Sequence, residues 1–102
     1  MRHKFHAKPV EIDDIKFSSK LEGRYYQKLK LAKKSGDLLF FLRQVPFHLP
    51  GKTKYVVDFV EFWKDGSILF TDCKGMVTEI FSLKKRQVEE LYPITLNIVT
   101  KV

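Results

Sequence analysis

Apolar residues recur at helical spacing in the first third of the chain, after a basic N-terminal stretch. The spacing predicts a helix over residues 18–34 with one buried stripe, formed by Leu21, Tyr25, Leu29 and Ala32. Ser19 is a favourable N-cap, and Glu22 three residues later completes a capping box. Gly36 is a typical stop signal, so the helix is expected to end just before it.

Apolar runs on both sides of this helix predict strands. Residues 10–17 are expected to form a small hairpin around a turn of two aspartates. Residues Leu38–Leu49 are typical of a strand, and Pro46 within them favours an edge position in the sheet. Gln44 shares a face of this strand with apolar side chains, and a polar group there needs a hydrogen-bond partner.

The last third of the chain predicts a second helix and a closing strand. The helix is expected within Thr78–Tyr92, capped at Ser82, with three inward-facing side chains, Leu83, Val88 and Leu91. A strand is expected from Ile94 to Val102. The order helix, three strands, helix, strand implies a right-handed crossover that makes the last strand parallel to its neighbour. We therefore expect one domain, residues 1–102, with an α/β (α+β) fold and a mixed sheet flanked by helices.

The stretch Tyr55–Gly75 carries the strongest hairpin signal, because two β-prone apolar runs flank the pair Asp65-Gly66. Its register depends on the loop. A two-residue loop made of this pair is one alternative, and a three-residue loop that starts at Lys64, with Gly66 left-handed, is the other. We predict the three-residue loop, because it gives one strand face an apolar half and a charged half.

The loop decides where the charged side chains of the hairpin lie. Asp58 faces Cys73 across a two-residue loop and Asp72 across a three-residue loop. Asp72 and Lys74 are two residues apart, so they share a face of the strand at a separation of about 7 Å. Opposed carboxylates repel each other unless positive charge lies between them, which Lys74 and a divalent cation would supply. A carboxylate at Asp58, amid apolar neighbours, is costly to bury unless it is paired or ligated.

Carboxylates on adjacent strands are suited to Mg²⁺, a hard cation that prefers oxygen ligands. Such an ion binds a phosphodiester oxygen and lowers the pKa of an attacking water. Lys74 would orient that water or offset charge on phosphorus, and Glu22 would act as an outer carboxylate. Each residue also has a structural alternative: a surface pair for Asp72 and Lys74, a backbone cap for Asp58, and the capping box alone for Glu22.

Charge and composition narrow the class of partner. The 102 residues include 19 Lys+Arg and 12 Asp+Glu, for a net charge of +7, which suits a polyanion such as nucleic acid. No apolar stretch approaches the roughly 20 residues of a membrane helix, and the N-terminus lacks the apolar run of a signal peptide. The one cysteine excludes an internal disulfide. We therefore expect a cytoplasmic protein without a membrane partner.

Two basic segments are candidate contacts for that polyanion. Residues 1–9 form a basic arm, in which His3 and His6 are expected to be solvated rather than metal-bound. A basic run in the first turns of the second helix comprises Lys84, Lys85 and Arg86. Cations near a helix N-terminus are unfavourable with respect to its dipole, so the run indicates either a DNA contact or an ordinary solvated face.

Four segments together resemble a known nuclease pattern: Phe17-x-Ser19-x-x-Glu22, Gln44-x-Pro46, Tyr55-x-x-Asp58-Phe59 and Asp72-x-Lys74-Gly75. The pattern resembles the PD-(D/E)XK nuclease superfamily and is most similar to its small phage-encoded members related to Holliday-junction resolvases. The resemblance extends from about Phe5 to the last strand, and the predicted αβββαβ order matches the core of that superfamily. Asp72 stands where many relatives have Glu, and Val57 where the Pro of the name would stand.

The resemblance implies a restriction-endonuclease-like core and a role for each residue. Asp58 and Asp72 would be metal ligands, Lys74 the catalytic lysine, Glu22 the helix carboxylate and Gln44 an accessory polar residue. It implies a Mg²⁺- or Mn²⁺-dependent endonuclease that cuts branched or junction DNA as a homodimer, in the host cytoplasm if it is phage-encoded. Two alternatives stay open: a non-catalytic basic nucleic-acid-binding or assembly protein with a vestigial site, and a nuclease that nicks or restricts other DNA targets.

Overall fold

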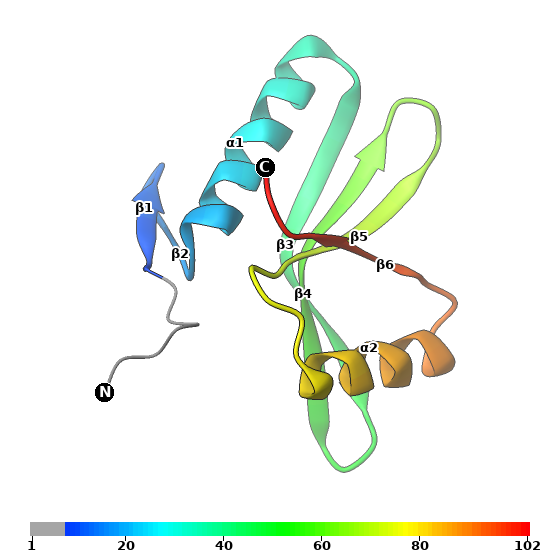
Figure 1. The fold of residues 1–102 in the computed structure, drawn as a ribbon. Coiled ribbons are helices and arrows are strands. Elements are labelled where there is room, and N and C mark those ends of the chain that lie inside the picture. The colour runs from blue at the N-terminus through cyan, green and yellow to red at the C-terminus, as the bar shows by residue number, and fades with distance from the viewer. Residues whose placement is uncertain (1–7) are drawn as a thin grey trace.

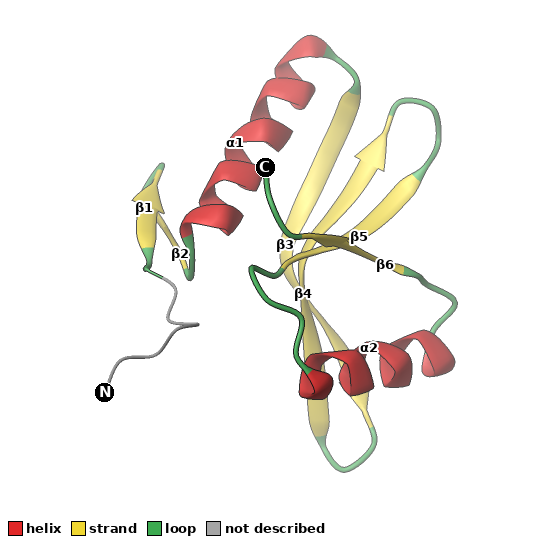
Figure 2. Cartoon of the chain, in the orientation of Figure 1, coloured by secondary structure: helices red, strands yellow, loops and turns green. Residues whose placement is uncertain are grey.

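Residues 8–102 are described in the computed structural model, which Figures 1 and 2 show as two helices beside a strongly twisted sheet. The elements in chain order are β1 (Val10–Ile12), β2 (Ile15–Phe17), α1 (Lys20–Ser35), β3 (Leu38–Leu49), β4 (Thr53–Trp63), β5 (Ile68–Cys73), α2 (Glu79–Leu91) and β6 (Leu96–Val99). Most of the N-terminal arm, including His3 and His6, lies outside the described residues.

Four strands form the main sheet in the order β3-β4-β5-β6. The pairs β3–β4 and β4–β5 are antiparallel, whereas β6 runs parallel to β5. The core order is therefore αβββαβ, and the predicted α+β fold with a mixed sheet is confirmed. Pro46 lies in the edge strand β3, as predicted. The expected N-terminal hairpin is also present, as the separate two-stranded sheet β1-β2.

Side-chain hydrogen bonds set the start of α1. The Ser19 hydroxyl accepts from the Glu22 N–H at 3.1 Å, and Gly36 closes the helix with a φ of 93°, both as predicted. The Glu22 carboxylate, however, does not return to Ser19 to complete a capping box. Its Oε1 accepts from the Ser18 hydroxyl at 2.8 Å, one residue before the cap, and its Oε2 accepts from a side chain of β3. The carboxylate therefore lies between the helix start and the sheet.

The second helix begins earlier than the sequence indicated. Its N-cap is Thr78, whose hydroxyl accepts from the Phe81 N–H at 3.1 Å, so the prediction of Ser82 as the cap is wrong. Phe81 and Val88 are the buried side chains of α2, and this fixes which face is inside. Leu83 follows Phe81 by two residues, about 200° round the helix, and is 49% exposed. The predicted inward positions of Leu83 and Leu91 are therefore wrong, and that of Val88 is confirmed.

Two hydrophobic clusters lie on opposite faces of the sheet, one beneath each helix. The α1 cluster contains the buried side chains of Phe17, Tyr25, Tyr26, Leu29, Leu38, Phe59 and Cys73. The α2 cluster contains those of Tyr55, Val57, Val60, Phe81, Val88 and Leu96. Phe59 and Val60 are successive residues of β4, so they point to opposite faces of the sheet. Each accordingly belongs to a different cluster.

The strand β4 changes face near its middle. Before Asp58, the residues that join the α2 cluster are Tyr55 and Val57, whereas after it the member is Val60. This is a change from odd to even positions, although side chains along a regular strand alternate strictly. The backbone around Asp58 is therefore rotated relative to a regular strand, and side chains from both ends of β4 pack under α2.

The edge strand β3 changes face at the same level. Phe41 packs against the α1 cluster, whereas Val45, also at an odd position, packs against the α2 cluster. The residue between them that lies across from Asp58 is Gln44, since the flanking positions pair in register. Gln44 has a φ of 53°, a left-handed conformation that is uncommon outside glycine. Figure 1 shows β3 and β4 twisting sharply together along their length.

Candidate active site

The hairpin that carries the predicted carboxylates has the three-residue loop. The Trp63 N–H donates to the Ser67 carbonyl at 2.9 Å, and Gly66 has a φ of 92°. Val60 pairs with Phe70, as predicted. The regular ladder of β4 and β5 ends at the next pair toward the middle of the sheet, Phe59 with Thr71. This register sets Asp58 across from Asp72, so the prediction on which the site depended is confirmed.

At this point the two carboxylates replace the backbone ladder. The Asp58 N–H donates to Oδ1 of Asp72 at 2.9 Å, and the Cys73 N–H donates to Oδ2 of Asp58 at 2.9 Å. The hydroxyl of Tyr55 donates to the other oxygen of Asp72. Each carboxylate is thus stabilised by N–H or O–H donors, although neither is in an ion pair with a cation among residues 8–102. Asp72 is 1% exposed.

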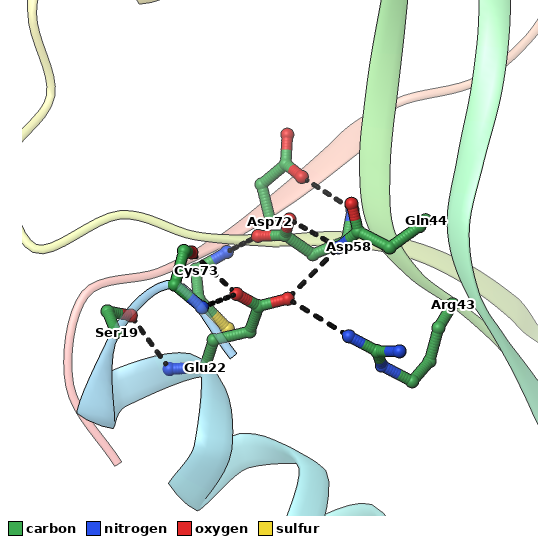
Figure 3. A network of polar contacts seen from close by, with 8 residues as sticks. Ser19, Glu22, Arg43, Gln44, Asp58, Asp72 and Cys73 are labelled. Atoms are coloured by element: carbon green, nitrogen blue, oxygen red, sulfur yellow. Dashed lines mark hydrogen bonds and ion pairs between the residues drawn. The ribbon is translucent and has the colours of Figure 1, made fainter. Parts of the chain in front are cut away.

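Glu22 joins the aspartates from α1, as predicted, and Gln44 connects them. The Gln44 side-chain amide donates to Oε2 of Glu22 at 3.0 Å and to Oδ1 of Asp58 at 3.4 Å. Figure 3 shows this amide between the two carboxylates. Glu22 is 3% exposed, and its nearest cationic group is the Arg43 guanidinium, with Nη2 3.8 Å from Oε2. The hydrogen-bond partners that the sequence required for Gln44 are therefore the carboxylates of Glu22 and Asp58.

Lys74 lies directly after β5 but does not point to the aspartates. Its backbone N–H donates to the Val99 carbonyl at 2.9 Å, and its ammonium lies 4.9 Å from the centroid of the Phe81 ring. Its positive charge nevertheless lowers the pKa of Asp58, so the two groups are electrostatically coupled. The structure brings Glu22, Gln44, Asp58 and Asp72 together and leaves Lys74 at the border of the group.

Negative charge exceeds positive charge at this site. The pKa of Asp58 is raised to about 6, chiefly by burial and also by the neighbouring carboxylates of Asp72 and Glu22, although the Cys73 N–H and Lys74 act in the opposite direction. A carboxyl group that titrates this close to neutral pH is typical of functional sites. The arrangement therefore has a free-energy cost that an added cation would relieve.

The donor set fits a divalent metal by its chemistry, since the three converging carboxylates offer only hard oxygen atoms. Within residues 8–102, however, no three His, Cys, Asp or Glu side chains are arranged so that they could hold an ion together. The Gln44 amide lies between two of the carboxylates, and it partly offsets their charge. Asp58 and Asp72 are the residues that would hold a cation, and this role stays a prediction. The Gln44 amide would have to move for Glu22 to join them.

The sequence assigned no role at the site to two residues that contact its carboxylates. Tyr55 binds Asp72, and Arg43 lies beside Glu22 with its guanidinium carbon 4.5 Å from the centroid of the Phe17 ring. Arg43 directly precedes Gln44, yet strict alternation would place it on the other face of β3. The face change at Gln44 and Asp58 brings Arg43 and Tyr55 to the carboxylates. No sequence pattern predicted this change.

Two other predicted features lie outside this group. Lys84, Lys85 and Arg86 occupy the middle of α2 rather than its first turn, and Lys85 pairs with Glu89 at 3.0 Å. A role for them in DNA binding stays a prediction. Cys73 belongs to the α1 cluster, and burial raises the pKa of its thiol, as befits a small apolar core residue rather than a nucleophile.

The sequence profile of the family described as "Protein of unknown function (DUF1064)" matches residues 2–102. The chain belongs to this family. No curated protein and no solved structure matches the chain. Neither helix of the described part of this DUF1064 protein is long and apolar enough to cross a membrane.

Proposed function

We propose that this protein is a Mg²⁺-dependent DNA endonuclease that hydrolyses phosphodiester bonds in branched or junction DNA. The observation that carries the proposal is the convergence of Glu22, Asp58 and Asp72, from α1, β4 and β5, at the break in the β4–β5 ladder. The charges of Glu22 and Asp72 raise the pKa of Asp58, so their repulsion acts on Asp58 without a cation, which is expected of a site shaped for a ligand rather than for stability.

In this proposal Asp58 and Asp72 hold the divalent ion. When bound, the ion polarises a phosphodiester oxygen and lowers the pKa of a water molecule. Glu22, held by the Ser18 hydroxyl at 2.8 Å, orients a water molecule from the α1 side. The Tyr55 hydroxyl fixes Asp72, so that carboxylate keeps its orientation when substrate enters.

Lys74 supplies positive charge at the reacting phosphate. Its ammonium now lies over the Phe81 ring, and a lysine side chain has enough rotatable bonds to turn from the ring to an anionic group. There it offsets the charge that develops on phosphorus. A phosphate that binds at the aspartates would draw the ammonium in, because the charge of Lys74 already acts on Asp58.

The resemblance to PD-(D/E)XK nucleases also supports a metal-dependent endonuclease. Within the αβββαβ order of the chain, Asp58 lies on the second strand, Asp72 on the third, and Lys74 directly after it. The net charge of +7 favours a polyanionic substrate. Junction resolution needs one cut in each of two strands. We therefore propose a homodimer, to be tested by analytical ultracentrifugation at several protein concentrations.

The decisive experiment is cleavage of a four-way DNA junction, with linear duplex of the same sequence as control. We expect cleavage of the junction with Mg²⁺ or Mn²⁺, loss of cleavage in Asp58→Asn, and a strong decrease in Lys74→Ala. Absence of cleavage with both ions, or an unchanged rate in Lys74→Ala, would refute the proposal. Nicking of the linear duplex at an equal rate would instead indicate the nicking or restriction alternative.

One observation favours a second candidate function, a nucleic-acid-binding or assembly protein with a vestigial site. The Lys74 ammonium is directed to Phe81, and within the described chain no three acidic groups are arranged around a point where an ion would sit. This candidate predicts salt-dependent DNA binding that divalent ions and Asp58→Asn leave unchanged. The same titrations, made with and without Mg²⁺, distinguish it from the nuclease.

A further inference from the structure

A hollow in the surface lies between α1 and β3, and none of the three carboxylates of the site lines it. Its lining consists of Tyr26, Lys30, Lys33, Lys34 and Phe41. Three of these five residues are lysines, and no acidic side chain lines the hollow. Lys30 is paired with Asp13, whereas Lys33 and Lys34 form no ion pair with any residue in the described range 8–102. The hollow is therefore a cationic surface with an apolar floor.

Arg43 lies between this hollow and the carboxylates, two residues beyond Phe41 on β3. Its guanidinium packs on the Phe17 ring, and Nη2 is 3.8 Å from the nearest oxygen of Glu22, too far for a hydrogen bond. Its Nε is buried and has no hydrogen-bond partner among the described residues. A buried guanidinium donor without an acceptor is costly. Nε is closed off from solvent, but the side chain is 23% exposed and its one charged partner among the described residues is distant, so the Nη groups can take a closer anionic acceptor.

The hollow, Arg43 and the carboxylates lie along one line. Glu22, Tyr26, Lys30 and Lys33 recur every three or four residues, so they lie on one face of α1. This face spans about 16 Å from Glu22 to Lys33. The strand β3 starts near the end of α1 and returns along it, which takes Phe41 past Tyr26 and Arg43 past Glu22. We call this strip, from Lys34 to Arg43, the α1–β3 seam.

We propose that the α1–β3 seam binds one strand of the DNA substrate, with Arg43 on the phosphate nearest the carboxylates and Lys33 and Lys34 on phosphates farther along the same strand. A guanidinium presents several N–H groups in a fixed plane and suits phosphate recognition. The apolar floor at Phe41 suits a sugar or base face. The choice of DNA as the ligand rests on the proposed function. The seam gives the substrate a path along α1 and β3, which is separate from the basic run of α2.

The first test measures single-stranded DNA binding by fluorescence anisotropy at several salt concentrations, in the Asp58→Asn background and without divalent ions. Each lost phosphate contact lowers the salt dependence, by about 0.7 in the slope of log K against log salt for a single strand. We expect Lys33→Ala with Lys34→Ala to lower the slope by about 1.4. The matched control pair, Arg24→Ala with Lys28→Ala, is exposed on the same helix and is expected to leave the slope unchanged.

The second test concerns Arg43. Arg43→Ala is expected to weaken DNA binding about tenfold or more and Arg43→Lys less, because the charge remains but the planar donors are lost. Both variants are first checked for native stability by urea unfolding. If Arg43 only balanced the charge of Glu22, its removal would have no effect on DNA binding in a Glu22→Gln background. In the proposed role, Arg43→Ala still weakens binding in that background.

The outcomes separate the seam from the nuclease. A lower slope for the Lys33 and Lys34 pair, together with a wild type that cuts no DNA with Mg²⁺ or Mn²⁺, supports the seam and refutes the endonuclease. Junction cleavage by a protein in which neither this pair nor Arg43→Ala affects DNA affinity refutes the seam and leaves the endonuclease standing. Equal effects of the seam pair and the Arg24 and Lys28 pair, or no DNA binding at all, also refute the seam.

Discussion

At the scale of single residues, the site is costly to fold. Glu22, Asp58 and Asp72 bring three carboxylates into a small, mostly buried space, and hydrogen-bond donors rather than cations stabilise them. Hydrogen bonds from backbone N–H groups offset part of the desolvation cost of a buried carboxylate. The high pKa of Asp58 shows that the offset is incomplete. Removal of a charge at the site should therefore raise the free energy of unfolding while it lowers the activity.

We predict that Asp58→Asn stabilises the protein near neutral pH while it abolishes cleavage. The pKa of Asp58 is raised from 3.8 to about 6, so the folded state holds this proton more tightly than the unfolded state does. The contribution of Asp58 to the free energy of unfolding is then fully present below about pH 4 and is lost as the pH rises through about 6. A shift of this size corresponds to at most about 3 kcal/mol.

Urea unfolding at about pH 8 and about pH 4 checks this prediction. The variant should gain about 1–3 kcal/mol at the higher pH and little at the lower one. Glu90→Gln removes an exposed carboxylate elsewhere and should change neither value. A variant that is less stable than the wild type at about pH 8 would contradict the electrostatic account of the site.

Tyr55→Phe should destabilise the protein through Asp72. The Tyr55 hydroxyl is the only donor to Oδ2 of Asp72 among the described residues, and Asp72 is buried. Loss of the donor leaves a buried carboxylate oxygen unsatisfied, at a cost of about 1–3 kcal/mol or more. Tyr26→Phe is the matched control, because it also deletes a hydroxyl bonded to an aspartate, but Asp13 is exposed and retains Lys30. The free energies of unfolding of the two variants should differ by more than about 1 kcal/mol.

At the scale of elements, the register of one hairpin assembles the site. The left-handed Gly66 closes the three-residue loop, and this sets Asp58 across from Asp72. A loop shorter by one residue would turn Asp58 to the other face. The strained conformation of Gln44 on β3 completes the assembly, because it rotates the strand where the amide must reach both Glu22 and Asp58.

Gly66→Ala tests the role of the loop. A Cβ at Gly66 would meet no atom within 4 Å, so the only cost is the left-handed backbone conformation, about 1 kcal/mol for a residue other than glycine. Gly75→Ala is the control, since it also adds a Cβ in open space without a positive φ. We expect lower stability for Gly66→Ala alone, together with faster hydrogen exchange of the Trp63 amide. Equal stability of the two variants would refute this role.

Local patterns predicted much of this arrangement, and tertiary packing decided the rest. The Ser19 cap and the Gly36 stop depend on neighbouring residues alone, and the sequence predicted them. The length of the loop at Gly66 followed from the apolar and charged halves of the strand face rather than from the loop residues. The cap of α2 did not follow, because burial of Phe81 selects Thr78 over Ser82. Roles for Arg43 and Tyr55 were missed because strict alternation fails at Gln44 in β3 and around Asp58 in β4. Nothing in the sequence indicated the left-handed conformation of Gln44.

At the scale of the whole molecule, the site exists only when the chain is folded. Its carboxylates come from α1, β4 and β5, and in an unfolded chain they lie too far apart to share an ion. A ligand that binds only the folded state raises the free energy of unfolding by RT ln(1 + [L]/Kd). At ten times Kd this amounts to about 1.4 kcal/mol, or an increase in Tm of about 6 °C for a domain of this size.

We therefore predict that Mg²⁺ or Mn²⁺ raises the Tm of the wild type in a thermal-unfolding titration. Asp58→Asn should start from a higher Tm near neutral pH and gain little from the ion, because it has lost both the repulsion and the ligand. Glu90→Gln should respond like the wild type, since it changes an exposed side chain of α2 and leaves the three carboxylates of the site in place. A wild type indifferent to both ions, or an equal gain in Asp58→Asn, would show that the carboxylates do not form a metal site. The vestigial alternative would then explain them better, because buried acidic groups that bind no cation only destabilise the fold.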